Sequence, residues 1–176
     1  IIDIGAESTR PGAQAISVEE EKRRIFPVLD EILRKVKVPV SIDTTKSQVA
    51  EQALASGAAI INDVSGLSAD EKIASLVSAY GAGLLLMHRR GMADNMQEFA
   101  EYRDVVNEVI EELWVSVRKA VDFGVNMDQI AIDPGIGFSK RAEHNWEILR
   151  SITSFYSFDR PLVLGISRKS FIGSLI

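Results

Sequence analysis

The sequence contains no cysteine, no long apolar run and no block of basic residues. The absence of cysteine excludes disulfide bonds, thiolate metal sites and a cysteine nucleophile, and it fits a reducing compartment such as the cytoplasm. No apolar run approaches the roughly 18 residues that a membrane helix needs, so we expect no membrane partner. The chain has 20 Lys and Arg residues and 25 Asp and Glu residues, so its net charge is −5, which argues against nucleic acid as a partner.

What the chain does contain is an alternation of apolar stretches of strand length with amphipathic segments. The strand candidates are 1–6, 38–43, 58–63, 82–88, 129–133 and 161–166. They are mostly continuous runs of Ile, Val and Leu, which is typical of strands covered on both faces in a parallel sheet. The helix candidates are 17–36, 46–56, 70–80, 104–123 and 142–154. The longest irregular stretch is 89–101, which we expect to be a mobile loop.

This alternation predicts one α/β domain, in which a closed barrel and an open doubly wound sheet are the two competing architectures. An open nucleotide-binding sheet usually carries a Gly-rich turn after its first strand, and neither G-x-G-x-x-G nor the P-loop pattern occurs. A barrel instead places its chemistry at the carboxyl ends of many strands.

Polar residues stand at or just past the carboxyl end of every strand candidate. They are Glu7 with Arg10, Asp43, Asn62 with Asp63, His88, Asp133, and Ser167-Arg168-Lys169. Any one of them has a simpler interpretation as a helix cap or turn residue. We expect His88 to be structural, since no second His or acidic residue has metal-ligand spacing. Six polar strand ends in succession nevertheless favour a barrel active site.

The chemistry of these strand ends indicates the kind of ligand. Carboxylates and amides at an apolar mouth require a ligand whose edge supplies matching donors and acceptors, as a flat nitrogen heterocycle with an amine and a carbonyl does. Arg10, Arg168 and Lys169 are cations suited to a phosphate or carboxylate group.

The run from Asp133 to Lys140, DPGIGFSK, is the most unusual local segment. Its two glycines allow a sharp turn and a close approach to a ligand, and Phe138 offers an aromatic face. A Gly-rich turn without a ligand remains the alternative. We interpret Lys140 and Arg141 as solvated turn residues.

Four runs together resemble dihydropteroate synthases. They are Glu7-Ser8-Thr9-Arg10-Pro11-Gly12, Ser41-Ile42-Asp43-Thr44, Asp133-Pro134-Gly135-Ile136-Gly137-Phe138 and Ser167-Arg168-Lys169-Ser170, with Ile61-Asn62-Asp63-Val64-Ser65-Gly66 and Leu86-Met87-His88 between them in the family's order. The resemblance extends over the whole chain. It implies a pterin-binding TIM barrel of folate biosynthesis, a transferase that joins 6-hydroxymethyl-7,8-dihydropterin pyrophosphate to 4-aminobenzoate and releases pyrophosphate.

The resemblance also implies roles for individual residues. The pterin site is implied to consist of Asp43, Asn62, Met87, Asp133 and Lys169, of which Asp43, Asn62, Asp133 and Lys169 are also the expected catalytic residues. The 4-aminobenzoate site, where sulfonamides compete, is implied to consist of Thr9, Arg10, Pro11, Phe138 and Ser170. Mg²⁺ is expected to neutralise the departing pyrophosphate, and the complete protein is expected to be a cytoplasmic homodimer.

Some features of the family are missing from this chain. The Asn-containing loop after the first barrel strand and the Arg and His of the last strand, which contribute to metal and pyrophosphate binding, do not occur, so we expect no metal ligand within residues 1–176. Ser139, where many members have Gly, and Arg89-Arg90, in place of a Met-containing pair, are interpreted as ordinary variation.

Two other functions remain open at this point. One is a pterin-binding methyltransferase domain of the same fold, which transfers a methyl group from methyltetrahydrofolate to a corrinoid protein. The other is a pterin-binding module without catalysis. The Glu7-to-Gly12 run and Ser167-Arg168-Lys169-Ser170 favour the synthase, because two cations and a hydroxyl suit pyrophosphate and a carboxylated amine.

The length refines the fold prediction. Six strand–helix units in 176 residues come to about 29 residues each, close to the roughly 31 of an eight-unit barrel of about 250 residues. We therefore expect an α/β TIM (β/α)8 barrel truncated to about strands 2–7, with residues 1–176 as one partial pterin-binding domain that lacks the first and last units. The opening Ile1-Ile2-Asp3-Ile4 has the pattern of a strand already under way, and we expect the fragment by itself to be inactive.

Overall fold

The computed structural model describes residues 1–10 and 12–173, with Ser170 described by its backbone alone. Five strands form one sheet in the order β1-β2-β3-β4-β5, and every neighbouring pair is parallel. The strands are β1 (Ile2–Gly5), β2 (Val40–Asp43), β3 (Ile60–Asp63), β4 (Gly83–Met87) and β5 (Ile130–Asp133). A helix follows each strand, which confirms the predicted α/β alternation.

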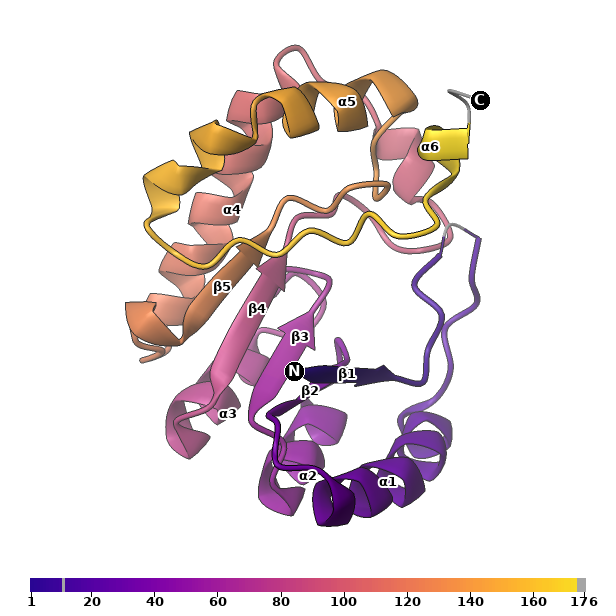
Figure 1. The fold of residues 1–176 in the computed structure, drawn as a ribbon, viewed down its shortest axis with the longest axis vertical. Coiled ribbons are helices and arrows are strands. Elements are labelled where there is room, and N and C mark those ends of the chain that lie inside the picture. Colours follow the sequence, from indigo (N-terminus) through magenta and orange to yellow (C-terminus); the bar gives the residue numbers. More distant parts are fainter. Residues whose placement is uncertain (11, 174–176) are drawn as a thin grey trace.

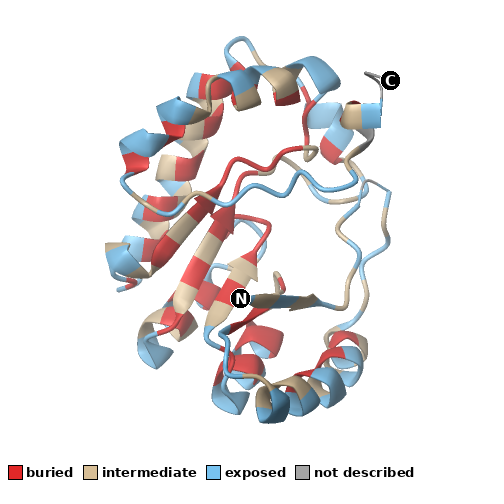
Figure 2. Cartoon of the chain, in the orientation of Figure 1, coloured by how far each residue is buried: buried red, intermediate tan, exposed pale blue. Residues whose placement is uncertain are grey.

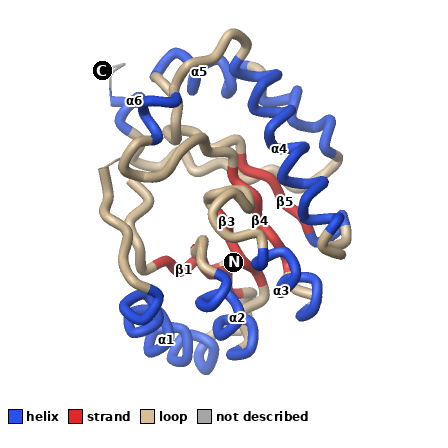
Figure 3. The backbone as a smooth tube through the Cα atoms, turned by 180° about the vertical axis from the view of Figure 1, so that it is seen from behind, coloured by secondary structure: helices blue, strands red, loops and turns tan. Residues whose placement is uncertain are grey.

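The sheet is curved, and the helices lie along its outer side, as expected for part of a barrel (Figures 1 and 3). The helices are α1 (Val18–Lys35), α2 (Ser47–Ser56), α3 (Lys72–Tyr80), α4 (Val105–Asp122), α5 (Ala142–Arg150) and the short α6 (Ser170–Gly173). Three 3₁₀ helices, η1 (Met96–Phe99), η2 (Met127–Gln129) and η3 (Ile152–Phe158), complete the described structure. The loop after β1 and the run from about residue 160 to 169 cross the open side of the curve.

The apolar pattern explains these elements. In α1, Ile25 and Leu29 are buried to 1% and 0% exposure on the stripe that faces the sheet. The hydroxyl of Ser17 accepts the N–H of Glu20 at 3.2 Å and caps the start of this helix. The core lies between the sheet and the inner faces of the helices, where buried residues concentrate in Figure 2.

The structure corrects the prediction of a sixth strand at 161–166. Only Leu162 forms a bridge, with Ile132, and the flanking bonds run from Ile132 N–H to the Pro161 carbonyl and from Val163 N–H to the Ile132 carbonyl. Beyond this point Val163, Leu164 and Ile166 are exposed, because nothing in the described part of the chain covers them. A continuous apolar run therefore predicted a strand that, among the described residues, has β5 alone as a neighbour.

Two smaller differences concern the ends of helical segments. The irregular stretch 89–101 contains η1, whose Met96 is fully buried, so this part of the stretch is folded onto the core. The helix predicted for 142–154 ends at Arg150 and continues as η3, which buries Phe155 and Phe158.

Candidate active site

The register of the sheet places the predicted strand-end residues in two pairs on neighbouring strands. Asp43 at the end of β2 pairs with Asn62 of β3, and Met87 at the end of β4 pairs with Asp133 of β5. Because the carboxyl ends of parallel strands meet at one edge, the two carboxylates, the amide and the thioether lie along a single rim. The structure thus brings together four of the five residues predicted for the heterocycle, and Lys169 reaches the same region from the run that crosses the open side.

The two rim carboxylates are held in environments that disfavour their charge. Burial raises the pKa of Asp43 to about 7. The nearby carboxylates of Asp3, Glu21 and Asp63 add to this shift, and the positive charge of Arg89 opposes it. No hydrogen bond to the Asp43 carboxylate is found among the described residues. A half-buried carboxyl group without protein donors at a cavity wall is a candidate for binding a ligand's N–H groups.

Asp133 is the second of these carboxylates and has one donor of its own. Burial raises its pKa to about 6, although the N–H of Gly135, at 2.7 Å, and the ammonium groups of Lys140 and Lys169 partly oppose the shift. Both rim carboxylates therefore titrate near neutral pH.

Two acidic residues near the rim differ from what the sequence suggests. Asp63 is fully buried, and its carboxylate accepts the Ser65 N–H at 2.8 Å and the Leu67 N–H at 2.8 Å, so it is a turn residue and not part of the cavity. Asp3, which sequence reasoning missed, accepts the Asn62 amide N–H at 3.1 Å from the neighbouring β1. The sequence signal that could have revealed Asp3 is its position as an acidic residue inside an otherwise apolar strand.

The segment after β5 is a tight, buried turn. Gly135 has a φ of +69°, and a Cβ atom there would lie 1.9 Å from the carbonyl oxygen of His88, so only glycine fits. Phe138 is half-buried, and the Lys169 ammonium lies 4.2 Å from the centroid of its ring. The predicted aromatic face and the predicted cation therefore lie side by side.

Lys140 was predicted to be solvated, and the structure corrects this prediction. Its side chain is buried, and its Nζ lies 2.8 Å from His88 Nδ1, 3.1 Å from the Gly135 carbonyl and 3.0 Å from the Phe138 carbonyl. Burial lowers the pKa of Lys140 to about 7. Lys140 thus holds the turn from inside, a role that its local sequence does not reveal.

His88 has the structural role that was expected. Since the ionised Glu112 carboxylate can only accept, His88 Nε2 carries the proton that is donated to it at 2.9 Å, and Nδ1 of the neutral ring is left to accept from Lys140. Burial lowers the pKa of His88 to about 4, which keeps the ring neutral.

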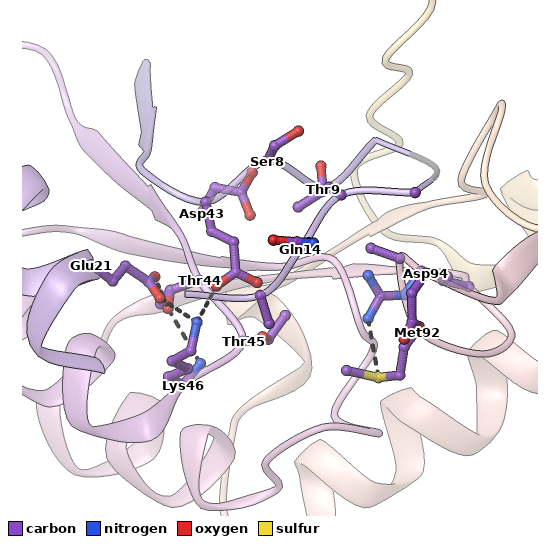
Figure 4. Close-up of a pocket in the computed structure, with 16 residues that line it drawn as sticks. Ser8, Thr9, Gln14, Glu21, Asp43, Thr44, Thr45, Lys46, Met92 and Asp94 are labelled. Carbon is purple, nitrogen blue, oxygen red and sulfur yellow. Dashed lines mark hydrogen bonds and ion pairs between the residues drawn. The ribbon is translucent and has the colours of Figure 1, made fainter. Parts of the chain in front are cut away.

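Two cavities open beside this rim. One, of about 1100 Å³, is lined by Thr9, Arg10, Phe138 and Lys169 among others, which brings together the described residues that were predicted for the carboxylated amine. The other, of about 550 Å³, is lined by Thr9, Asp43 and the residues shown in Figure 4. Thr9 lines both cavities, so the two cavities adjoin. Of the five residues predicted for the heterocycle, Asp43 lines the smaller cavity and Lys169 the larger, and the other three line neither. Pro11 and the side chain of Ser170 lie outside the described residues.

Arg89, interpreted from the sequence as ordinary variation, forms part of the wall of the smaller cavity. Burial lowers the pKa of this guanidinium, while the carboxylates of Asp63, Asp43 and Glu7 oppose the shift. Its buried Nε has no hydrogen-bond partner in the described part of the chain. Arg89 therefore supplies positive charge beside Asp43, which no sequence motif indicated.

Neither a metal cluster nor a membrane span is found in the described residues. Residues 1–10 and 12–173 contain no group of three or more His, Asp or Glu side chains that could hold a metal ion. The same residues form no helix that is long and apolar enough to cross a membrane.

Comparison with known proteins identifies the family to which the chain is similar. A family model described as "Pterin binding enzyme" matches residues 1–176. The dihydropteroate synthase of Synechocystis sp. is 42% identical over 176 residues, which are 100% of this chain and 61% of that protein. The chain spans about three fifths of the length of the curated relatives it matches.

Two solved structures are similar in fold as well as in sequence. Anaplasma phagocytophilum dihydropteroate synthase with bound 6-hydroxymethylpterin-monophosphate has a TM-score of 0.93 at 37% identity, with 99% of this chain and 70% of that chain covered. Yersinia pestis dihydropteroate synthase in a sulfonamide complex has a TM-score of 0.94 at 34% identity, with 99% and 63% covered. The partial barrel and the family resemblance are thereby confirmed, and the relatives favour the synthase over the methyltransferase alternative.

Proposed function

Because this chain belongs to the family of pterin-binding enzymes, we propose that the protein is a dihydropteroate synthase. This transferase condenses 6-hydroxymethyl-7,8-dihydropterin pyrophosphate with 4-aminobenzoate to give 7,8-dihydropteroate and pyrophosphate. The observation that carries the proposal is the rim of Asp43, Asn62 and Asp133 beside a cavity lined by Thr9, Arg10 and Phe138. A polar heterocycle and a carboxylated aromatic amine have adjoining places there.

The rim is the proposed pterin site. Asp43, Asn62 and Asp133 offer carboxylate and amide groups to the ring edge, Lys169 donates from the open side, and the buried Met87 supplies an apolar wall. Binding would supply the donors that the Asp43 carboxylate lacks in the described structure. The raised pKa values of the two carboxyl groups would then fall, because hydrogen bonds from the ligand favour the ionised form.

The larger cavity is the proposed 4-aminobenzoate site. Arg10 and Lys169 provide positive charge for the carboxylate, and Phe138 provides a face for the benzene ring. Pro11 and Ser170 are predicted to complete this site. Sulfonamides resemble 4-aminobenzoate in shape and charge, and we propose that they compete with it here.

The reaction then needs positioning and electrostatics more than a strong base. The bond between the pterin methylene carbon and the pyrophosphate oxygen breaks, and its electron pair leaves with pyrophosphate. The cation that remains is delocalised over the pterin ring, where ionised Asp133 at the ring edge stabilises it. The amine nitrogen of 4-aminobenzoate forms the new bond to the methylene carbon and releases one proton to water.

We also propose Mg²⁺ as a partner of the pyrophosphate in the complete enzyme. The described residues do not fit a protein-held Mg²⁺ site, since they contain no cluster of three candidate ligands. We therefore assign it no step of the reaction. A cytoplasmic homodimer for the complete protein, and no turnover by residues 1–176 alone, are further parts of this proposal.

Incorporation of labelled 4-aminobenzoate by the complete protein tests the function. We expect product only when the pterin pyrophosphate is present, with competitive inhibition by a sulfonamide. Asp133→Asn should lower kcat/KM by about 10²–10³-fold, because it removes one electrostatic contact to the developing cation. Lys35→Met, which affects only an exposed ion pair with Glu31, is the control. Methyl transfer to a corrinoid protein without incorporation of the label would contradict the proposal.

A further inference from the structure

The loop between β1 and α1 reaches the site with few backbone hydrogen bonds among its described residues. In residues 8–10 and 12–15 these run from Ala13 N–H to the Arg10 carbonyl at 3.0 Å and from Gly12 N–H to the Ala93 carbonyl at 2.8 Å. Arg10 is exposed and Thr9 is half-buried. A long surface loop with so few internal bonds needs support from elsewhere if its side chains are to be held in one place.

Glu7 supplies that support at the base of the loop. Its carboxylate oxygen Oε2 accepts the N–H of Ile16 at 3.1 Å, so one side chain joins the two ends of residues 8–15. The same oxygen accepts a hydrogen bond from the ammonium of Lys46, which belongs to the turn after β2. Glu7 lines the smaller cavity, as expected of a residue at the mouth of the site, and its carboxylate is at the same time engaged with its own chain.

Lys46 continues the connection into the core. Its Nζ also donates to Glu21 of α1 at 2.5 Å, and Glu21 is only 1% exposed. Burial by itself would lower the pKa of Lys46, but the two carboxylates outweigh it and raise the pKa, so the ammonium persists. Figure 4 shows Lys46 joined to Glu21 at one side of the smaller cavity.

Thr44 also binds the buried carboxylate of Glu21. Its hydroxyl donates to Glu21 Oε1 at 2.6 Å and accepts the backbone N–H of Lys46 at 3.2 Å. Thr44 directly follows Asp43, so the same turn carries the rim carboxylate and the lysine that holds the loop. Charged hydrogen bonds with partners this buried are stronger than exposed ion pairs.

We propose that Glu7, Lys46 and Glu21 form a clasp that positions the loop 8–15, and with it Thr9 and Arg10, over the 4-aminobenzoate site. This inference rests on the proposed function for the identity of the ligand alone. The three residues are positioning residues, because their polar atoms bind one another. Loss of the clasp should weaken binding of the second substrate and leave the pterin rim in place.

The test uses the complete enzyme with Lys46→Met, Glu7→Gln and the double variant. We expect Lys46→Met to raise the KM for 4-aminobenzoate by about 10-fold or more, since small displacements of binding groups have large effects. The dissociation constant for the pterin pyrophosphate should change by less than about 2-fold. The double variant should match Lys46→Met and not the product of the two single effects, because Glu7 and Lys46 act through one contact.

Hydrogen exchange supplies a readout that does not depend on activity. The amides of Gly12 and Ile16 should exchange faster in Lys46→Met, while those of β2 and β3 stay protected. Lys46→Arg should restore protection and KM in part. Lys35→Met, which removes only an exposed ion pair with Glu31 at the far end of α1, should alter neither. If Lys46→Met does not fold, Glu7→Gln and Lys46→Arg carry the same comparison.

The outcomes separate the two proposals. An unchanged KM for 4-aminobenzoate and unchanged loop exchange in an active Lys46→Met enzyme overturn the clasp. Equal losses of affinity for both substrates overturn it too, because they indicate general damage. A wild-type enzyme that shows no condensation overturns the proposed function, while faster loop exchange in Lys46→Met would still support the clasp.

Discussion

Two loops flank the site, and they are held in opposite ways. The loop after β1 is long and mostly exposed, and Glu7 and Lys46 fasten it from outside at its base. The turn after β5 is short and buried, and Lys140 holds it from inside through the carbonyls of Gly135 and Phe138. The first loop depends on a charged clasp at its ends, while the second depends on packing at every residue.

This difference suggests a division of labour within the site. A mostly buried turn whose carbonyls of Gly135 and Phe138 are bonded to Lys140 has little freedom. It suits a carboxylate such as Asp133, whose angle to a ring edge must be correct to form paired hydrogen bonds. A loop fastened only at its base leaves Thr9 and Arg10 more freedom to adjust to a ligand.

Gly135→Ala should destabilise the protein most. The new Cβ would lie 1.9 Å from the His88 carbonyl oxygen, so backbone must move, and the residue has a positive φ. We expect the free energy of unfolding, measured by urea denaturation, to fall by more than about 4 kcal/mol. Gly12→Ala is the matched control, since Gly12 also has a positive φ, of +79°, but no atom within 4 Å of a Cβ. Its cost should be about 1 kcal/mol, and equal costs at the two positions would contradict the comparison.

Lys140→Met should have the next largest effect. The thioether leaves His88 Nδ1 and the carbonyls of Gly135 and Phe138 without a donor, although it also removes a buried charge. We expect the free energy of unfolding to fall by about 2–4 kcal/mol in thermal or urea denaturation. A stable variant with an unchanged turn would show that packing alone holds this segment.

Asp43→Asn should stabilise the protein, with a pH dependence set by the raised pKa. In the unfolded chain this carboxyl group titrates near 4, and in the folded protein burial raises its pKa to about 7. Below about pH 4 it is protonated in both states, whereas above pH 7 the folded state bears the full cost of the charge. We therefore expect a gain of about 1–3 kcal/mol at pH 8 that vanishes near pH 4.

Asp133→Asn is the matched variant with which Asp43→Asn is compared. The Gly135 N–H and two ammonium groups already favour ionised Asp133, so its gain in stability at pH 8 should be smaller. Unfolding curves of the wild type and both variants at several pH values measure the difference. If Asp43→Asn still raises the free energy of unfolding at pH 4, the charge of the carboxylate is not the cause of the stabilisation.

The limits of sequence reasoning are clearest in three polar residues that follow strands. Glu7 and Asp63 have the same local appearance as Asp43 and Asp133, and Lys140 has that of a solvated turn residue, yet the structure engages all three in holding loops and turns. Their partners explain why, since Lys46 is 39 residues from Glu7 and His88 is 52 residues from Lys140. The segment 161–166 shows the same limit, because an apolar run does not reveal whether a strand lies on its other side.

What the sequence by itself determined is the parallel α/β alternation and the place of Asp43, Asn62, Met87 and Asp133 at the ends of strands. Periodicity, caps and strand ends are local properties, so a single chain read in order contains them. Only the tertiary structure decided which polar groups line the cavities, which fasten the loops around them, and how far burial moves the pKa values of the rim carboxyl groups. Those outcomes depend on contacts between residues far apart in the chain and on the solvent that the fold excludes.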